Sequence, residues 1–193
     1  AKQYPYITLN SVNLWWFFTD QAGPDFRAAP ADNVAWWSGM TPKTIGFGLL
    51  ALVTLFVIVA VFLGRGERRA IWLGALALAL GFFCLPTEIH ERYGYPILPA
   101  ALVAALLAGR RYWVLAVALS SAHFLNLVFA ASGGEGAPRA AWAWVVGLAQ
   151  WPFTGRLIAV INLACLVGTV VHLGRLTIFR PPRAEATVIL SGR

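Results

Sequence analysis

The sequence is poor in charged residues, which make up only 12% of its 193 positions. Hydrophobic residues make up 59%, and the mean hydropathy is +0.68. A soluble domain typically holds about 25% charged and about 45–50% apolar residues. Because a surface that faces water needs charge, this deficit excludes an ordinary soluble domain and predicts a membrane protein. A chain of this length has room for roughly five to seven helices that each cross a bilayer with about 20 residues.

Cysteine is scarce as well. Cys84 and Cys165 both lie inside apolar segments, so they predict buried thiols rather than a disulfide framework. No metal-ligand spacing is present, and we expect neither a metal nor a cofactor. A signal-peptide pattern and an initiator Met are missing too. The chain begins with a polar and aromatic segment, which suggests a piece of a longer protein.

Acidic residues are fewer than basic ones, which gives a formal net charge of +7. Such an excess can indicate nucleic-acid binding. Here the basic residues form short clusters between apolar runs. Membrane orientation and contact with anionic membrane lipids explain this pattern better, and no nucleic acid is expected as a partner.

Apolar stretches predict an all-α polytopic membrane protein with about five transmembrane helices. The predicted spans cover residues 44–63, 70–86, 96–109, 112–131 and 155–174, within a membrane domain at 44–175. The third stretch is too short to cross about 30 Å by itself. Residues 1–43 are predicted to form an extracytoplasmic loop with an interfacial helical or loop segment at 7–18, and residues 176–193 a cytoplasmic tail.

The charges of the connecting segments agree with this topology. The segments assigned to the cytoplasmic side hold nine Lys or Arg and two acids, whereas the opposite side holds six of each. The positive-inside rule expects this asymmetry. The sequence therefore predicts a multi-pass protein, in the inner membrane if the source is bacterial, with its C-terminus in the cytoplasm.

One polar segment lies between the second and third predicted spans. Residues 85–96 read LPTEIHERYGYP and place Glu88, His90, Glu91 and Arg92 within five positions. An exposed polar turn would explain this composition. However, the segment is short, is bounded by prolines, and mixes a cation, an imidazole and two carboxylates. That mixture suits anion recognition, with Arg92 gripping a phosphate bidentately, or proton handling by His90.

The string HERYGYP, with an apolar span before it and ILPAL after it, resembles the His-Glu-Arg-Tyr segment of bacterial GT-C glycosyltransferases. These polytopic enzymes are similar to the mannosyltransferases of the GPI and dolichol pathways. The opening YPYITLNSVNLWW resembles an extracytoplasmic segment of the same group, in which Asn10, Asn13, Trp15 and Trp16 would face substrate. The run SSAHFLNL at 120–127 is similar to a late helix of the group, so that the resemblance covers most of the chain.

The resemblance implies a hexosyltransferase whose donor is a polyprenyl-phosphate-linked sugar and whose site faces the non-cytoplasmic side. His90 and Arg92 would bind the donor phosphate, and Glu88, Glu91 and Tyr93 would support them. A carboxylate would act as general base on the acceptor hydroxyl, while cations stabilise the departing phosphate.

In the family this base lies in the first extracytoplasmic loop. Asp20, Asp25 and Asp32 do not follow a first span here, so the base is expected upstream of this chain. The chain would then be the C-terminal part of such an enzyme and would not catalyse alone.

Two other classes stay open. A transporter or flippase fragment for lipid-linked sugars would use the same cations without a base, but such proteins usually show internal repeats, and none is evident. A non-catalytic membrane scaffold would need no chemistry in the polar segment. His123 and Asn126 share one face of a predicted span, and for them we favour an interhelical hydrogen bond. Asn162 is assigned to packing and His172 to the membrane interface.

Overall fold

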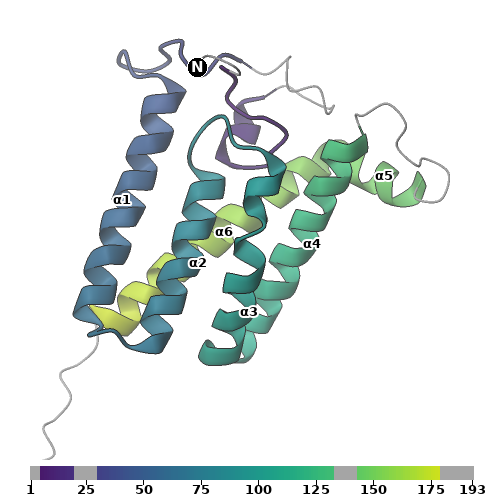
Figure 1. Cartoon of the computed structure of the whole chain (residues 1–193). Coiled ribbons are helices and arrows are strands. Elements are labelled where there is room, and N and C mark those ends of the chain that lie inside the picture. The colour runs from purple at the N-terminus through teal and green to yellow at the C-terminus, as the bar shows by residue number, and fades with distance from the viewer. Residues whose placement is uncertain (1–4, 20–29, 133–142, 179–193) are drawn as a thin grey trace, which may run out of the picture.

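The computed structural model describes residues 5–19, 30–132 and 143–178 (Figure 1). Within these ranges the chain is helical and contains only isolated β-bridges beside its helices. The prediction of an all-helical fold is therefore confirmed for the described residues. The 3-10 turns are η1 (Leu14–Phe18) and η3 (Glu91–Gly94), and the α-helices are α1 (Pro42–Leu63), α2 (Arg68–Cys84), α3 (Ile97–Ala108), α4 (Arg110–Ser132), α5 (Ala143–Gln150) and α6 (Pro152–Thr177).

Three helices, α1, α4 and α6, are long and apolar enough to cross a membrane. Most of α1 faces outward, and large side chains such as Leu52 and Phe62 are 65% and 81% exposed. Water would penalise such a surface, whereas lipid tails would not. The three helices are therefore compatible with an integral membrane protein. Helix α1 begins two residues earlier than predicted, because Pro42 occupies its first turn and the Thr41 hydroxyl accepts a hydrogen bond from the Thr44 N–H.

The other two predicted spans form shorter helices. Helix α2 has 17 residues and α3 has 12, which correspond to about 25 Å and about 18 Å. The second predicted span ends at Cys84 rather than at residue 86, because the chain turns into the polar segment there. The structure thus does not confirm five spans.

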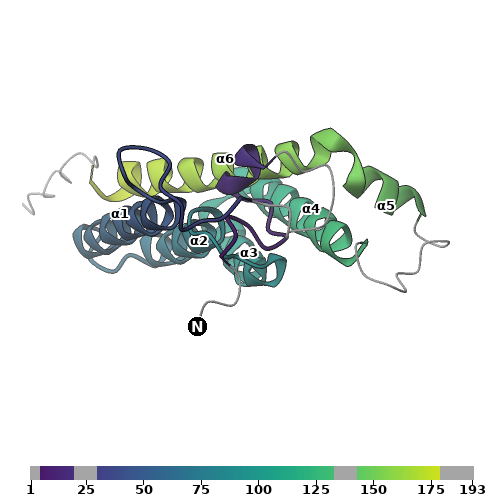
Figure 2. The same cartoon turned by 90° about the horizontal axis from the view of Figure 1, so that it is seen from above.

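Helix α2 lies at the centre of the bundle, packed against α1, α3 and α6. Figure 2 shows α6 running along one side of the row formed by the other helices, and α6 contacts α1, α2 and α4. The core is built by large side chains of α2 and small ones of α3. It includes Leu73, Leu76, Leu80, Phe83, Ala100, Ala101, Ala104 and Ala105. The alanines let α3 approach its neighbours closely.

The two ends of the bundle differ in charge. One end, called here the arginine-rich end, carries Arg65, Arg68, Arg69, Arg110, Arg111 and Arg175, and Glu67 is its single acid among the described residues. The opposite end, called the loop end, holds the N-terminal segment and residues 85–96 (Figure 1). The charge asymmetry seen in the sequence is thus an asymmetry between the ends of one bundle.

Candidate functional site

The N-terminal segment is bound to the helices by two buried asparagines. Asn126 of α4 accepts a hydrogen bond from the Val12 N–H at 3.1 Å and donates one to the Asn10 carbonyl at 2.7 Å. Asn162 of α6 donates to the Val12 carbonyl at 3.1 Å. The predicted interhelical hydrogen bond of Asn126 is therefore wrong. Because the segment is not helical here, its backbone groups need partners, and the asparagines supply them.

Three of the four residues expected to face substrate are buried in protein contacts. The side-chain Oδ1 of Asn13 caps η1 by accepting from the Trp15 N–H at 3.0 Å. The Trp15 indole N–H donates to the Leu85 carbonyl at 2.7 Å, and Trp16 packs edge-on against Phe129. The fourth residue, Asn10, is partly buried and has a φ of 67°. In this conformation Asn13, Trp15 and Trp16 hold the polar segment and the bundle together.

The polar segment at 85–96 is fixed from two sides. Its Ile89 carbonyl accepts from the Leu9 N–H at 3.2 Å, which pairs it with the N-terminal segment. On the other side, Gly94 lies against the ring of His123, and a Cβ at this glycine would come within 2.6 Å of that ring. The segment is therefore tied to the N-terminal segment on one side and to α4 on the other, at the loop end of the bundle.

Four consecutive residues form what we call the HERY cluster: His90, Glu91, Arg92 and Tyr93. The His90 Nδ1 and Glu91 Oε2 atoms are 3.9 Å apart, and their side chains are 24% and 20% exposed. The Tyr93 ring stands perpendicular to His90 with centroids 5.7 Å apart, and the Arg92 guanidinium lies 5.8 Å from the Tyr93 centroid. The 3-10 turn thus gathers an imidazole, a carboxylate, a guanidinium and a phenol.

Burial, and secondly the charge of Arg92, lower the pKa of His90 below its ordinary 6.5, although Glu91 acts in the opposite direction. At neutral pH the His90 imidazole is therefore mainly uncharged and offers one N–H donor. Arg92 is exposed, and no carboxylate of the described chain lies within ion-pair distance of it. The permanent positive charge of the cluster is thus open to an anion from outside.

The surroundings of Arg92 are aromatic. Phe82, Tyr93 and Tyr95 are 45%, 40% and 53% exposed, and the Phe82 and Tyr93 rings are 6.1 Å apart. An exposed cation beside exposed aromatic rings suits a ligand with an anionic group and an apolar part.

His123 joins this neighbourhood from α4. It is buried, its ring is 5.2 Å from Tyr95 and 6.3 Å from Phe83, and its Nε2 atom has no hydrogen-bond partner in the described ranges. The sequence predicted a hydrogen bond between helices for this residue. The aromatic and glycine contacts around it replace that bond. In the sequence, the signal for a functional role of His123 was its place as an ionisable residue within an apolar helix.

Glu88 does not belong to the HERY cluster. It has a φ of 60° and forms an ion pair with Lys43 of α1, with Oε1 and Nζ 2.9 Å apart. Next to this pair, Asp32 is 1% exposed and accepts a hydrogen bond from the Thr87 hydroxyl at 2.7 Å. We call Asp32, Lys43, Thr87 and Glu88 the Asp32 cluster. Its members come from three segments, so sequence spacing alone gave no signal for it.

Burial raises the pKa of Asp32, and the Glu88 carboxylate adds to this effect, whereas the Thr87 hydrogen bond and Lys43 oppose it. The Oδ1 atom of Asp32 is buried and has no hydrogen-bond partner within the described residues. Asp32 is therefore a carboxylate held in an unfavourable setting for charge. The other two aspartates considered as bases, Asp20 and Asp25, lie outside the described residues.

Metal binding finds no support in the described ranges, where no group of three His, Cys, Asp or Glu side chains is arranged to hold an ion. In comparisons with known proteins, no family model, no curated protein and no solved structure matches the chain. The chemical groups that point to a function lie at the loop end.

Proposed function

We propose that the chain is the C-terminal portion of a GT-C-type membrane glycosyltransferase, in which the HERY cluster binds the phosphate of a polyprenyl-phosphate-linked sugar. The observation that carries this proposal is the exposed Arg92 beside His90, set among exposed aromatic rings. A guanidinium can hold a phosphate bidentately, and an uncharged imidazole can donate one further hydrogen bond. The polyprenyl chain would lie against the apolar surface outside the cluster.

Sugar transfer requires Arg92 and His90 when the bond between the sugar and the phosphate breaks. The acceptor hydroxyl attacks the anomeric carbon, the bond from that carbon to the phosphate oxygen breaks, and the lipid phosphate leaves with both electrons of the bond. Arg92 and His90 stabilise the negative charge that develops on the phosphate. Glu91, 3.9 Å from His90, orients the imidazole. The hydroxyl proton goes to a carboxylate base, which the resemblance puts upstream of this chain.

The position of the segment supports a lipid substrate. It lies at the loop end beside apolar helices and carries exposed aromatic rings, so the phosphate of a donor can bind there while its polyprenyl chain stays in the membrane.

The proposal includes five spans, with α2 and α3 crossing beside α1, α4 and α6. Its support is the packing of α2 against α1, α3 and α6, together with the charge asymmetry between the two ends of the bundle. The positive-inside rule then places the arginine-rich end and the C-terminus in the cytoplasm. The loop end faces the other side of a bacterial inner membrane.

The test uses the full gene product in membranes with a radiolabelled polyprenyl-phosphate sugar. We expect Arg92→Ala to lower sugar transfer by about 100-fold or more, as for other lost donors to a developing oxyanion. Arg92→Lys should restore only part of the rate, because Lys lacks the planar fork. Arg156→Ala is the matched control, since it removes an exposed arginine near the start of α6 at the same end.

Equal detergent stability of the three variants would show that each folds normally. A normal transfer rate with Arg92→Ala would contradict the proposal. If the intact donor crossed the bilayer and no glycosylated product formed, the protein would be a transporter for lipid-linked sugars, the second class that the sequence left open.

A further inference from the structure

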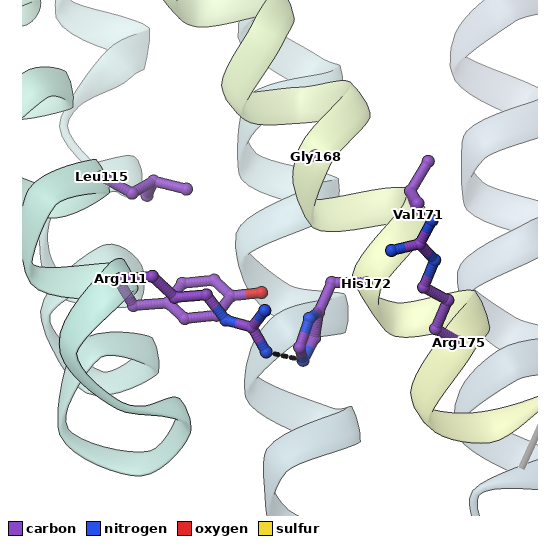
Figure 3. A pocket seen from close by; sticks show the side chains of 7 residues that line it. Arg111, Leu115, Gly168, Val171, His172 and Arg175 are labelled. Atoms are coloured by element: carbon purple, nitrogen blue, oxygen red, sulfur yellow. Dashed lines mark hydrogen bonds between the residues drawn. The ribbon is translucent and has the colours of Figure 1, made fainter.

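A cavity of about 310 Å³ lies at the arginine-rich end, between the start of α4 and the end of α6 (Figure 3). Its volume falls at the lower end of the range for ligand sites, about 300–1,000 Å³. Its lining residues are Arg111, Tyr112, Leu115, Gly168, Val171, His172 and Arg175. Arg111 and His123 are twelve residues apart on α4, which separates this cavity from the level of His123 by about 18 Å. It is therefore distinct from the HERY cluster.

One part of the cavity is cationic. Arg111 and His172 approach each other across it, with Nη2 and Nε2 3.5 Å apart, and Arg175 lies one helical turn beyond His172 (Figure 3). The buried Tyr112 ring stands perpendicular to the His172 ring, with centroids 5.5 Å apart. None of the described carboxylates forms an ion pair with Arg111 or Arg175. Two permanent positive charges and a histidine thus line one cavity.

The other part of the cavity is apolar. Leu115 lies one turn after Arg111 on α4, Val171 lies beside the Arg175 side chain, and Gly168 stands one turn before His172 (Figure 3). A Cβ placed at Gly168 would meet no atom within 4 Å, so the missing side chain leaves open space. The opening therefore continues from a cationic region at the helix ends along an apolar surface of α6.

We infer that this cavity binds the phosphate group of an anionic phospholipid. Arg111 and Arg175 hold the phosphate oxygens, and His172, positioned by Tyr112, offers a further polar contact. The first carbons of the acyl region lie along Leu115 and Val171 over Gly168. Delocalised attraction to an anionic membrane would need no cavity, and free phosphate would need no apolar region.

The experiment measures lipid retained by the purified chain in nanodiscs that contain phosphatidylglycerol or, for comparison, only phosphatidylcholine. Arg111→Gln and Arg175→Gln should each lower the retained phosphatidylglycerol by about fivefold, as expected for one cation near a phosphate. Arg110→Gln is the matched control, since it removes an adjacent, exposed arginine that does not line the cavity. Equal losses for Arg110→Gln and Arg111→Gln would mean delocalised attraction and would overturn the inference.

A second arm separates the lipid from free phosphate. Gly168→Leu should fill the apolar region and lower lipid retention while both arginines stay in place. Inorganic phosphate at millimolar concentration should not displace the lipid from the unmodified chain. If Gly168→Leu retained lipid fully and inorganic phosphate displaced it, the ligand would be free phosphate, and the lipid assignment would be wrong. Equal unfolding temperatures in lipid-free detergent would exclude misfolding, because Arg111, Arg175 and Gly168 are exposed.

Discussion

The hydrogen bonds of Asn126 offer a direct test of how the loop end is assembled. Its side chain is fully buried and serves two backbone groups, the Val12 N–H and the Asn10 carbonyl. Asn126→Ala removes both partners. Val12 is 1% exposed, so its N–H would stay unsatisfied, whereas the partly exposed Asn10 can regain water. The unsatisfied Val12 N–H therefore accounts for most of the expected loss of stability.

Leaving a buried backbone donor without a partner costs about 1–3 kcal/mol. Side-chain hydrogen bonds within membrane proteins average about 0.6 kcal/mol, because the unfolded reference state also finds partners. We expect the larger value for Asn126, since its partners belong to a non-helical segment that cannot satisfy them by itself. The N-terminal segment should then open about 5-fold to 150-fold more often.

Amide hydrogen exchange in detergent measures this opening. The Leu9 amide is the reporter, because it donates to the Ile89 carbonyl and is released only if the segment leaves the polar loop. Asn162→Ala should have a smaller effect, since it removes one hydrogen bond, to the Val12 carbonyl. Ser121→Ala, at an exposed position of α4, is the control. If Asn126→Ala changes the exchange rate of the Leu9 amide no more than Ser121→Ala does, the hydrogen bonds of Asn126 do not hold the N-terminal segment in place.

Two further predictions concern the loop end. Because burial raises the pKa of Asp32 above its unfolded value, stability is greatest below the unfolded pKa of about 3.9 and falls as the pH rises through the folded pKa. Asp32→Asn should remove this part of the pH dependence, as measured by detergent unfolding between about pH 3 and pH 7. Parallel curves of stability against pH for the variant and the unmodified protein would contradict the prediction. Gly94→Ala should cost about 1–3 kcal/mol of stability, since the new methyl meets the His123 ring at 2.6 Å. Gly48→Ala, which meets no atom within 4 Å, should be close to neutral in the same unfolding assay, so equal effects at the two positions would be the contrary result.

The sequence anticipated the HERY cluster because its members are consecutive. A single 3-10 turn brings His90, Glu91, Arg92 and Tyr93 together, so local chain geometry was sufficient. Glu88 is only two residues away, yet its positive φ and its ion pair with Lys43 direct it elsewhere. Proximity in the sequence therefore grouped the four residues of the HERY cluster as the structure does. It wrongly added Glu88 to them.

Other parts of the site depend on residues far apart in the chain. Asp32 meets Thr87, and His123 meets Gly94, only because the bundle brings their segments together. Without homologous sequences, no spacing or composition indicates such pairs. The same holds for Asn126, whose partners are more than a hundred residues away.

The membrane class and the charge asymmetry followed from the sequence by itself, because partition into lipid depends on composition along short stretches. The long apolar runs of α1, α4 and α6 needed no tertiary information. Only the tertiary structure decided that Asn126 and Asn162 bind the N-terminal segment, and that Arg111 and Arg175 line one cavity. Apolar runs depend on near neighbours in the sequence, whereas cavities and buried hydrogen bonds arise from the packing of distant segments.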